Sequence, residues 1–163
     1  MRRPTTFISA LVLMLSLTGP DFSAANSSTN LTVPVGCTPH PVSPARQEEI
    51  FYAFSDSFYV KQNVSEAFTY IVKDYINHNV NVLDGIESAF DYLAPRLATN
   101  TPQQIIHQTF SAPYGWVHHI VEPGNVEPTA IVDVYRFNGS CVAEHWDVIQ
   151  QRPANTSNPH ALF

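Results

Sequence analysis

The sequence predicts one α+β domain, a cone in which three helices pack against a strongly curved antiparallel sheet. Two observations lead to this prediction. Apolar residues recur at helical spacing between residues 44 and 97, and after residue 102 they alternate with period two. Helices that precede an antiparallel sheet are typical of α+β folds. The amphipathic helices must bury their apolar stripes against the concave face of the curved sheet. We expect a pocket inside the cone that the helices and the sheet enclose.

The first 25 residues have the features of a secretory signal peptide. Basic residues follow Met1, an apolar run covers residues 7–17, and Ser23 and Ala25 are small residues at the expected cleavage positions. The run is short for a membrane span, and no other segment is apolar enough to be one. We therefore expect residues 1–25 to be removed and the protein to be secreted into the extracellular space.

Cysteines and sequons agree with export. The only two cysteines are Cys37 and Cys141. An oxidising compartment favours a disulfide between them, and two free thiols are the competing interpretation. Five Asn-x-Ser/Thr sequons are candidate glycosylation sites in a eukaryotic host. They are Asn26, Asn30, Asn63, Asn138 and Asn155.

Charge and motifs exclude several classes of function. The chain has 163 residues, a formal net charge of −6 and no cluster of Lys or Arg, so it is a poor candidate for binding nucleic acid or an anionic membrane. It contains no glycine-rich phosphate loop and no nucleophile elbow. A small-molecule partner fits this composition better.

The helical half begins after a proline-rich extended arm at residues 26–44. Ser43 followed by proline predicts a helix start, and this helix runs to about Tyr59. A shorter helix begins near Asn63. The sequence KDYINHN that follows is interpreted as irregular. Asp84 is expected to cap a third helix, whose apolar stripe is Ile86, Ala89, Phe90, Leu93 and Leu97.

The second half is read as four strands and a flexible tail at 153–163. The strands are Gln104–Ser111, Trp116–Glu122, Thr129–Phe137 and Cys141–Ile149. The last two are joined by Asn138-Gly139, a strong hairpin signal because both residues tolerate positive φ. Alternation places Asp133 on one face of its strand, and His145 and Asp147 together on one face of the next. Such a polar cluster is either solvated or lines the pocket.

Four segments together resemble SnoaL-like proteins of the nuclear transport factor 2-like superfamily. They are DYINHN, DGIESAFDYL, VHHIVEP and AIVDVYRF-NG-SCVAEHWDVIQ. The resemblance places the SnoaL-like domain at residues 45–152. It implies a cone-shaped barrel with a hydrophobic pocket, often dimeric. Some members close polyketide rings by aldol condensation, others isomerise, dehydrate or open epoxides, and many only bind ligands. The recurrent polar positions fall on His78, His118, Asp133, Glu144, His145, Trp146 and Asp147.

Ring closure of this kind needs a base that takes a proton α to a carbonyl and a donor for the enolate oxygen. Asp133 is the first candidate for the base, because burial in an apolar pocket would raise its pKa. Asp147 is the rival base, and His145 and His118 are the candidate donors. The alternative is that Asp133 and His145 form a buried hydrogen-bonded pair that only fixes the sheet.

Four further residues are expected to line the pocket, and His119 is expected to point away from it. The four pocket residues are His78, Tyr135, Phe54 and Trp116. His78 either caps the pocket or bonds to backbone. A metal site that combines histidines with Asp133 is a weaker alternative, because no short ligand spacing such as His-x-His occurs. We therefore expect neither a metal nor another cofactor.

The leading hypothesis is a secreted, cofactor-free cyclase, isomerase or dehydratase for a hydrophobic polyketide- or terpenoid-like carbonyl compound. The alternative is a non-catalytic carrier of a small apolar ligand, since the same fold can serve either role. Nucleic acid and membrane are not expected partners. The resemblance also implies a homodimer formed through the sheet.

Overall fold

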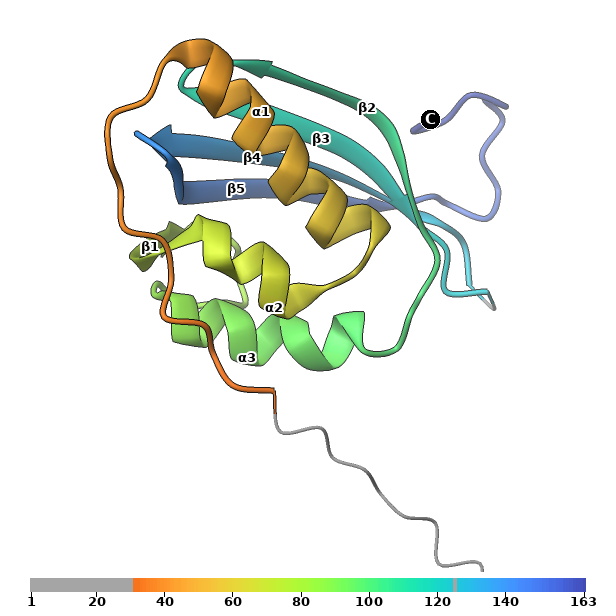
Figure 1. The fold of residues 1–163 in the computed structure, drawn as a ribbon. Helices are drawn as coiled ribbons and strands as arrows, with labels where there is room; N and C mark the ends of the chain where they lie inside the picture. The colour runs from red at the N-terminus through yellow and green to blue at the C-terminus, as the bar shows by residue number, and fades with distance from the viewer. Residues whose placement is uncertain (1–30, 125) are drawn as a thin grey trace, which may run out of the picture.

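The structure is a computed structural model that describes residues 31–124 and 126–163. The expected signal peptide and the sequons at Asn26 and Asn30 lie outside the described residues. Helices and a curved sheet follow one another along the chain as predicted, and the helices cover one face of the sheet (Figure 1).

The first helical region begins and ends where the sequence predicts. Helix α1 (Pro44–Ser55) is capped by Ser43, whose side chain accepts a hydrogen bond from the Arg46 backbone N–H. It continues as one π-helical stretch, η1 (Asp56–Val60), which carries the chain past Tyr59. The short helix α2 (Val64–Ala67) is capped by Asn63 and runs into the 3₁₀ turn η2 (Phe68–Tyr70).

Strand β1 (Ile71–Asn77) replaces the segment that was predicted to be irregular. Its residues do not alternate regularly between buried and exposed, so they give little strand signal. β1 forms through long-range pairing, since it runs parallel to β5 (Cys141–Gln151). The predicted antiparallel strands are present, and β1 adds one parallel pair at the edge of the sheet.

Helix α3 (Ile86–Leu97) carries the predicted apolar stripe, although its cap differs from the prediction. Gly85 occupies the N-cap position, with φ of 97°, and makes no side-chain cap. The Asp84 carboxylate instead accepts a hydrogen bond from the Asn77 backbone N–H at 2.8 Å. Asp84 thereby ties the end of β1 to the loop before α3, which brings this loop beside the sheet.

The remaining strands match the predicted ranges within a few residues. They are β2 (Gln103–Ser111), β3 (Tyr114–Val121) and β4 (Thr129–Asn138), and the strand order is β1-β5-β4-β3-β2. A bulge interrupts the β4–β5 register after Arg136. Because of this bulge Val142 is buried, although simple alternation placed it on the outer face.

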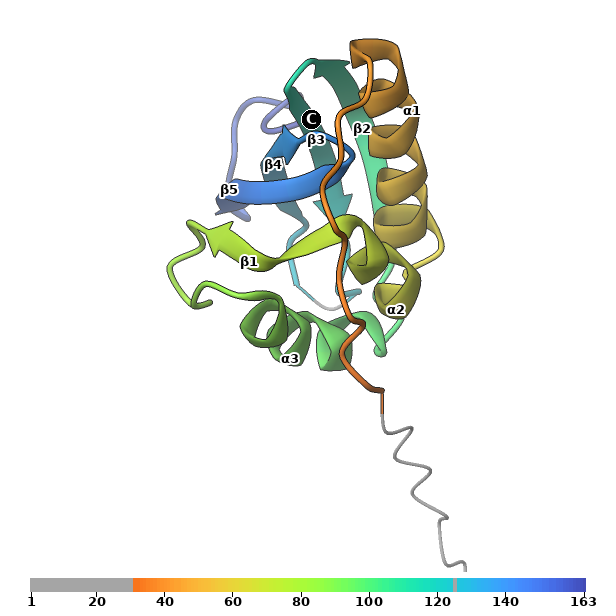
Figure 2. The same cartoon turned by 60° about the vertical axis from the view of Figure 1, so that its left-hand side comes forward.

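The N-terminal arm runs past the start of β1 (Figure 2). The predicted disulfide between Cys37 and Cys141 is present, and Cys37 also forms a parallel bridge to Val72. The Ser140 backbone N–H donates to the His40 carbonyl at 3.0 Å. The arm is therefore joined to the start of β1 and to the β4–β5 turn.

The core lies between the helices and the concave face of the sheet. Phe51, Phe54, Phe68 and Phe90 are almost completely buried there. Among the described residues, no helix is both long and apolar enough to cross a membrane. The C-terminal tail returns to the opposite face of the sheet, where the Phe163 ring stacks on His118 at 6.3 Å between centroids.

Candidate active site

A cavity of about 440 Å³ opens between α3 and the concave face of the sheet. Its volume lies in the range of small-molecule sites. Its apolar wall is made by Phe58, Val82, Leu93, Leu97, Val121, Ile131 and Ile149. Its polar lining includes Asn77, Asn79, Arg96, Thr99, Thr101, Gln103, His119, Asp133, Tyr135, His145 and Asp147.

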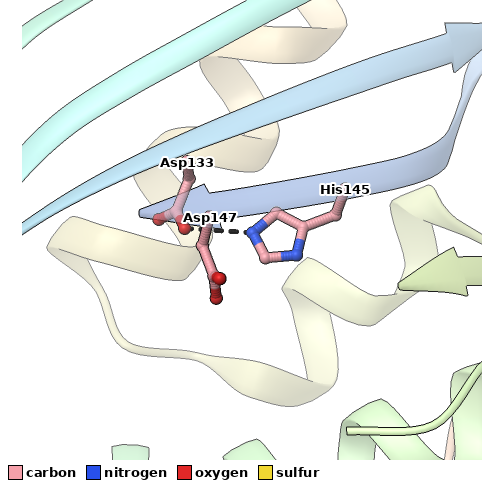
Figure 3. A group of neighbouring side chains, drawn as sticks. All are labelled: Asp133, His145 and Asp147. Carbon is pink, nitrogen blue, oxygen red and sulfur yellow. Dashed lines mark hydrogen bonds and ion pairs between the residues drawn. The ribbon is translucent and has the colours of Figure 1, made fainter. Parts of the chain in front are cut away.

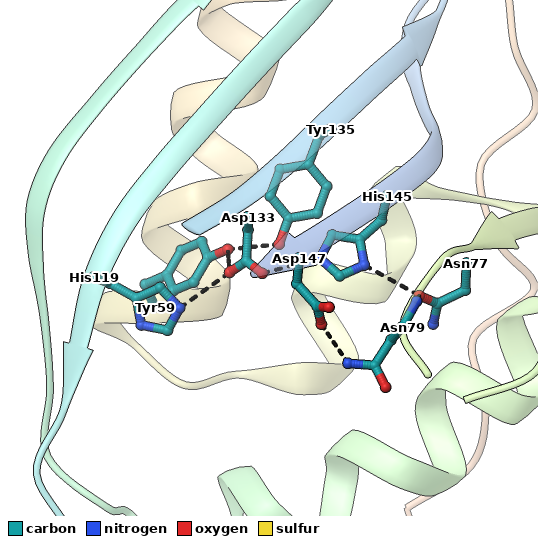
Figure 4. Close-up of polar contacts among 8 residues, drawn as sticks. All are labelled: Tyr59, Asn77, Asn79, His119, Asp133, Tyr135, His145 and Asp147. Atoms are coloured by element: carbon teal, nitrogen blue, oxygen red, sulfur yellow. Dashed lines mark hydrogen bonds and ion pairs between the residues drawn. The ribbon is translucent and has the colours of Figure 1, made fainter. Parts of the chain in front are cut away.

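Asp133 is the centre of the polar network (Figure 4). Its side chain is buried, and three side chains donate to it. The Tyr59 hydroxyl donates to Oδ2 at 2.5 Å, His119 Nε2 lies 3.0 Å from Oδ2, and His145 Nε2 lies 3.0 Å from Oδ1. Asp133 is thus saturated by donors from one helical segment and two neighbouring strands.

These donors overturn the expected pKa of Asp133. Burial by itself raises the pKa of this carboxyl group, as the sequence analysis assumed. The hydrogen bonds from His119 and His145, and the charge of these rings, outweigh burial and hold the pKa well below its usual range. Asp133 is therefore a stable carboxylate and a weak base. The predicted rise in its pKa was wrong because the donors could not be recognised in the sequence.

Two tyrosines extend the network toward the cavity. The hydroxyl oxygens of Tyr59 and Tyr135 lie 2.5 Å apart, and Tyr135 lines the cavity as predicted. Burial and the negative charge of Asp133 raise the pKa of both hydroxyl groups well above the usual tyrosine value. Both tyrosines therefore stay protonated at neutral pH and can donate. Since Tyr59 donates its one proton to Asp133, the Tyr135 hydroxyl is the donor in the contact between the two tyrosines.

His145 is held from both ring nitrogens. Its Nε2 faces Asp133, and its Nδ1 lies 3.2 Å from Asn77 Oδ1. That oxygen also accepts from the Asn79 backbone N–H at 3.1 Å, which fixes the orientation of the Asn77 amide. Both His145 nitrogens thus face side-chain oxygens, which fixes the position and the plane of the ring.

Asp147 differs from Asp133 in how its oxygens are engaged. The two carboxylates are direct partners across β4 and β5, so their side chains share the cavity face. Asp147 is only half-buried. Its Oδ2 accepts from the Asn79 side-chain amide, and within the described chain its Oδ1 has no hydrogen-bond partner. Asp147 is therefore a carboxylate with one oxygen open to the cavity.

Asp133, His145 and Asp147 also form a group with metal-ligand chemistry (Figure 3). One ligand atom from each lies within 4.8 Å of the others. The His145 nitrogen in this group already bonds to Asp133, so a divalent cation would have to replace that hydrogen bond. Two carboxylates and one imidazole suit Mn²⁺, Fe²⁺ or Zn²⁺.

The positions predicted for His118 and His119 of β3 are reversed in the structure. Val117 is the direct partner of Asp133, so odd-numbered residues of β3 share its face and His119 enters the network. His118, the predicted donor, lies on the opposite face and stacks on His107. The Nδ1 atom of His119 is buried and has no hydrogen-bond partner among the described residues. Alternation along β3 was predicted correctly, but which of its faces meets the cavity was not.

Three other predicted pocket residues do not line the cavity. His78 lies outside, where it contacts Glu144 Oε1 at 2.9 Å and stacks on Trp146. Trp116 is on the same face as His118 and is 38% exposed. Phe54 is 1% exposed and packs in the core against Tyr135.

The outer face of the last hairpin carries a cross-strand ion pair. Arg136 Nε donates to Glu144 Oε2 at 2.6 Å. The contacts with His78 and Arg136 hold the pKa of Glu144 below its usual range. Glu144 and Trp146 therefore stay outside the cavity, and the homodimer through this face stays a prediction.

Sequence reasoning missed four polar residues of the site. Tyr59 was predicted only as the approximate end of the first helix. Asn77 and Asn79 lie in the segment predicted to be irregular, and Arg96 is in the last turn of α3. The one available signal was that Asn77 and Asn79 flank His78, a position implied by the resemblance.

Comparisons with solved structures address the fold. A SnoaL-like protein from Burkholderia thailandensis is 12% identical, with a TM-score of 0.53 over 68% of this chain and 99% of that one. An NTF2-like protein from Burkholderia xenovorans is 9% identical, with a TM-score of 0.55 over 69% and 89%. The described chain has the NTF2-like fold. The α+β cone of the sequence analysis is thereby confirmed.

A third structure with the NTF2-like fold carries a functional name. It is a candidate polyketide cyclase from Acidithiobacillus ferrooxidans, 12% identical, with a TM-score of 0.52 over 64% of this chain and 88% of that one. A scan of family models and a search of curated proteins find no match to the sequence. At these identities the NTF2-like fold is shown, and the chemistry has to be argued from the cavity.

Proposed function

We propose that this protein is an acid–base enzyme that removes a proton α to the carbonyl group of a hydrophobic ligand. The observation that carries the proposal is the unequal engagement of the two cavity carboxylates. Asp133 is saturated by three donors, whereas Asp147 keeps Oδ1 open to the cavity. A carboxylate with a free oxygen, beside a donor network and under an apolar wall, is suited to proton abstraction.

Asp147 is the base in this proposal. The C–H bond α to the carbonyl breaks, the proton moves to Asp147 Oδ1, and the electron pair passes to the carbonyl oxygen to give an enolate. On ligand binding, the Tyr135 hydroxyl turns its proton from the Tyr59 oxygen to that oxygen and donates to it. In ring closure the enolate carbon attacks an internal carbonyl group, and the alkoxide that forms takes the proton from Asp147. In isomerisation another carbon atom takes this proton, and in elimination the electron pair of the enolate expels a leaving group that takes it.

Asp133 takes the role of anchor instead of base. It fixes Tyr59, His119 and His145 in one geometry, and its low pKa keeps it charged while the reaction proceeds. This assignment replaces the first choice of the sequence analysis with its stated rival, and the physical reason is the number of donors on each carboxylate.

Two further observations support the substrate class and the location of the enzyme. The wall of the cavity is mainly aliphatic and aromatic, which suits a polyketide- or terpenoid-like ligand, and a polyketide cyclase name is attached to one structure of the same fold. Export is supported by the disulfide, which is typical of oxidising compartments, and by exposed sequons at Asn63, Asn138 and Asn155. We propose a secreted enzyme on these grounds.

Deuterium incorporation tests this function without knowledge of the downstream step. The purified mature protein is incubated in D₂O with a small-molecule extract of its producing culture, and mass spectrometry identifies compounds that gain deuterium. The wild type is expected to label at least one retained compound. Asp147→Asn should retain that compound and lose labelling, and Asp91→Asn, an exposed carboxylate of α3, is the matched control. Retention without labelling by the wild type would identify a carrier.

A further inference from the structure

We infer that the ligand of this cavity carries an anionic group, such as a carboxylate or sulfonate, that binds Arg96 at the mouth. This inference rests on the proposed function, because it specifies the substrate class of the same cavity. Arg96 is the only lysine or arginine in the cavity lining. The Arg96 guanidinium is therefore a positive charge in a cavity whose polar network is centred on the carboxylates Asp133 and Asp147.

Arg96 is held in place but its charge is left uncompensated. Its guanidinium carbon lies 3.4 Å from the centre of the Tyr92 ring, and Nη1 donates to the Tyr92 carbonyl at 2.5 Å. A guanidinium group has five N–H donors, so most stay available. The stack on the ring fixes the plane of the group, which lowers the entropic cost of binding a planar anion.

The other arginines of the described chain have carboxylate partners. These pairs are Arg46 with Glu49, Arg136 with Glu144, and Arg152 with Glu127. Within the described residues no carboxylate forms an ion pair with Arg96. An arginine at a helix C-terminus often only bonds to the last carbonyl groups. That structural role accounts for one N–H of Arg96 and does not account for its place in the cavity lining.

The chain that follows Arg96 joins the sheet at a distance from the carboxylate pair. Arg96 lies in the last turn of α3, and the chain leads from there through Thr99 and Thr101 into the first residues of β2, where Gln103 pairs with Val121. Val121 in turn pairs with Thr129, the first residue of β4.

Asp133 lies four residues further along β4 than Thr129, and its partner across the sheet is Asp147. At about 3.4 Å per residue this is a separation of about 13 Å along the sheet. Ile131 and Ile149 form the pair between these two positions. The ligand is therefore an elongated amphipathic acid: its anionic end lies at Arg96, its apolar body lies on the isoleucine pair, and its carbonyl end reaches Asp147.

Two fluorescent probes with the same aromatic skeleton test this inference. The first is 8-anilinonaphthalene-1-sulfonate, and the second is N-phenyl-1-naphthylamine, which lacks the sulfonate. Arg96→Gln should weaken binding of the sulfonate about fivefold, the scale of a partly exposed ion pair, and leave the uncharged probe within twofold. Arg96→Lys should restore part of the loss. Arg46→Gln, on the exposed side of α1, is the matched control and should change neither affinity.

A cavity-filling variant, Ile131→Trp, should abolish binding of both probes and so assign their site. If Arg96→Gln weakens the binding of both probes equally, Arg96 has only a structural role. If it changes the affinity for neither probe, Arg96 takes no part in binding. Either result overturns the inference and leaves the proposed function unaffected. If wild-type protein binds neither probe, the cavity is closed to ligands, and the inference and the proposed function fall together. Selective loss of the sulfonate supports the inference.

Discussion

Replacement of Asp133 by Asn is the perturbation whose effect the structure specifies most fully. The change keeps the shape of the side chain and removes its charge. It also places an NH₂ group, which is a donor, opposite groups that donate to the carboxylate in the wild type. Tyr59, His119 and His145 each lose part of a charged hydrogen bond in a buried site. Breaking one partner of a buried ionic network costs about 3–5 kcal/mol. For a domain of this size that corresponds to a fall in Tm of roughly 10 °C.

Urea unfolding of the wild type and Asp133→Asn, followed by circular dichroism at several pH values, measures this cost. Because the pKa of Asp133 is depressed in the folded state, its contribution to stability is fully present above the unfolded value of about 3.9 and is lost as pH falls toward the folded value. The difference between the two proteins should therefore be constant between pH 7 and 5 and should shrink below about pH 4.

Asp147→Asn serves as the matched control in that experiment. Its carboxylate is half-buried and accepts one hydrogen bond, so its replacement should cost about 1 kcal/mol. A loss below about 0.5 kcal/mol for Asp133→Asn, or a difference that grows as pH falls, would refute the view of Asp133 as a charged anchor.

Three further predictions concern the arm, the core and the phase of β3. Cys37→Ser should lower the free energy of unfolding by about 3 kcal/mol, since the disulfide joins residues 104 apart in sequence; a loss below about 1 kcal/mol in urea would mean that backbone contacts alone hold the arm. Phe54→Ala should cost about 3–5 kcal/mol because the ring is 1% exposed, and an intact Tm would contradict its place in the core. His119→Ala should slow deuterium incorporation roughly tenfold to a hundredfold by loosening Asp133, whereas His118→Ala on the outer face should leave it unchanged; the reverse order would contradict the observed strand phase.

Local signals were sufficient for much of the fold. The hairpin around Asn138 was predicted because turn chemistry and alternation agree in one short stretch. The cap at Ser43 and the stripe of α3 were found for the same reason. The disulfide followed from composition and compartment, since Cys37 and Cys141 have no other partner in the sequence.

The errors arose where long-range pairing decides the structure. Strand β1 has no regular alternation of apolar and polar residues, and it forms by pairing with β5. His118 and His119 are adjacent, and only the pairing of Val117 with Asp133 determines which of them faces the cavity. The same dependence explains the pKa of Asp133, because its donors come from segments 12 to 74 residues away in sequence.

The rate of deuterium transfer per ligand-bound molecule shows whether Asp147 is the catalytic base. Asp147→Asn and Asp133→Asn are compared with wild type on the labelled compound, each at a concentration that saturates binding and at a temperature where it is folded. The account predicts that Asp147→Asn binds the compound but transfers deuterium about 10² to 10⁴ times more slowly, the contribution of a general base. It predicts a smaller loss for Asp133→Asn. Transfer at the wild-type rate by Asp147→Asn would contradict the account and return the role of base to another group.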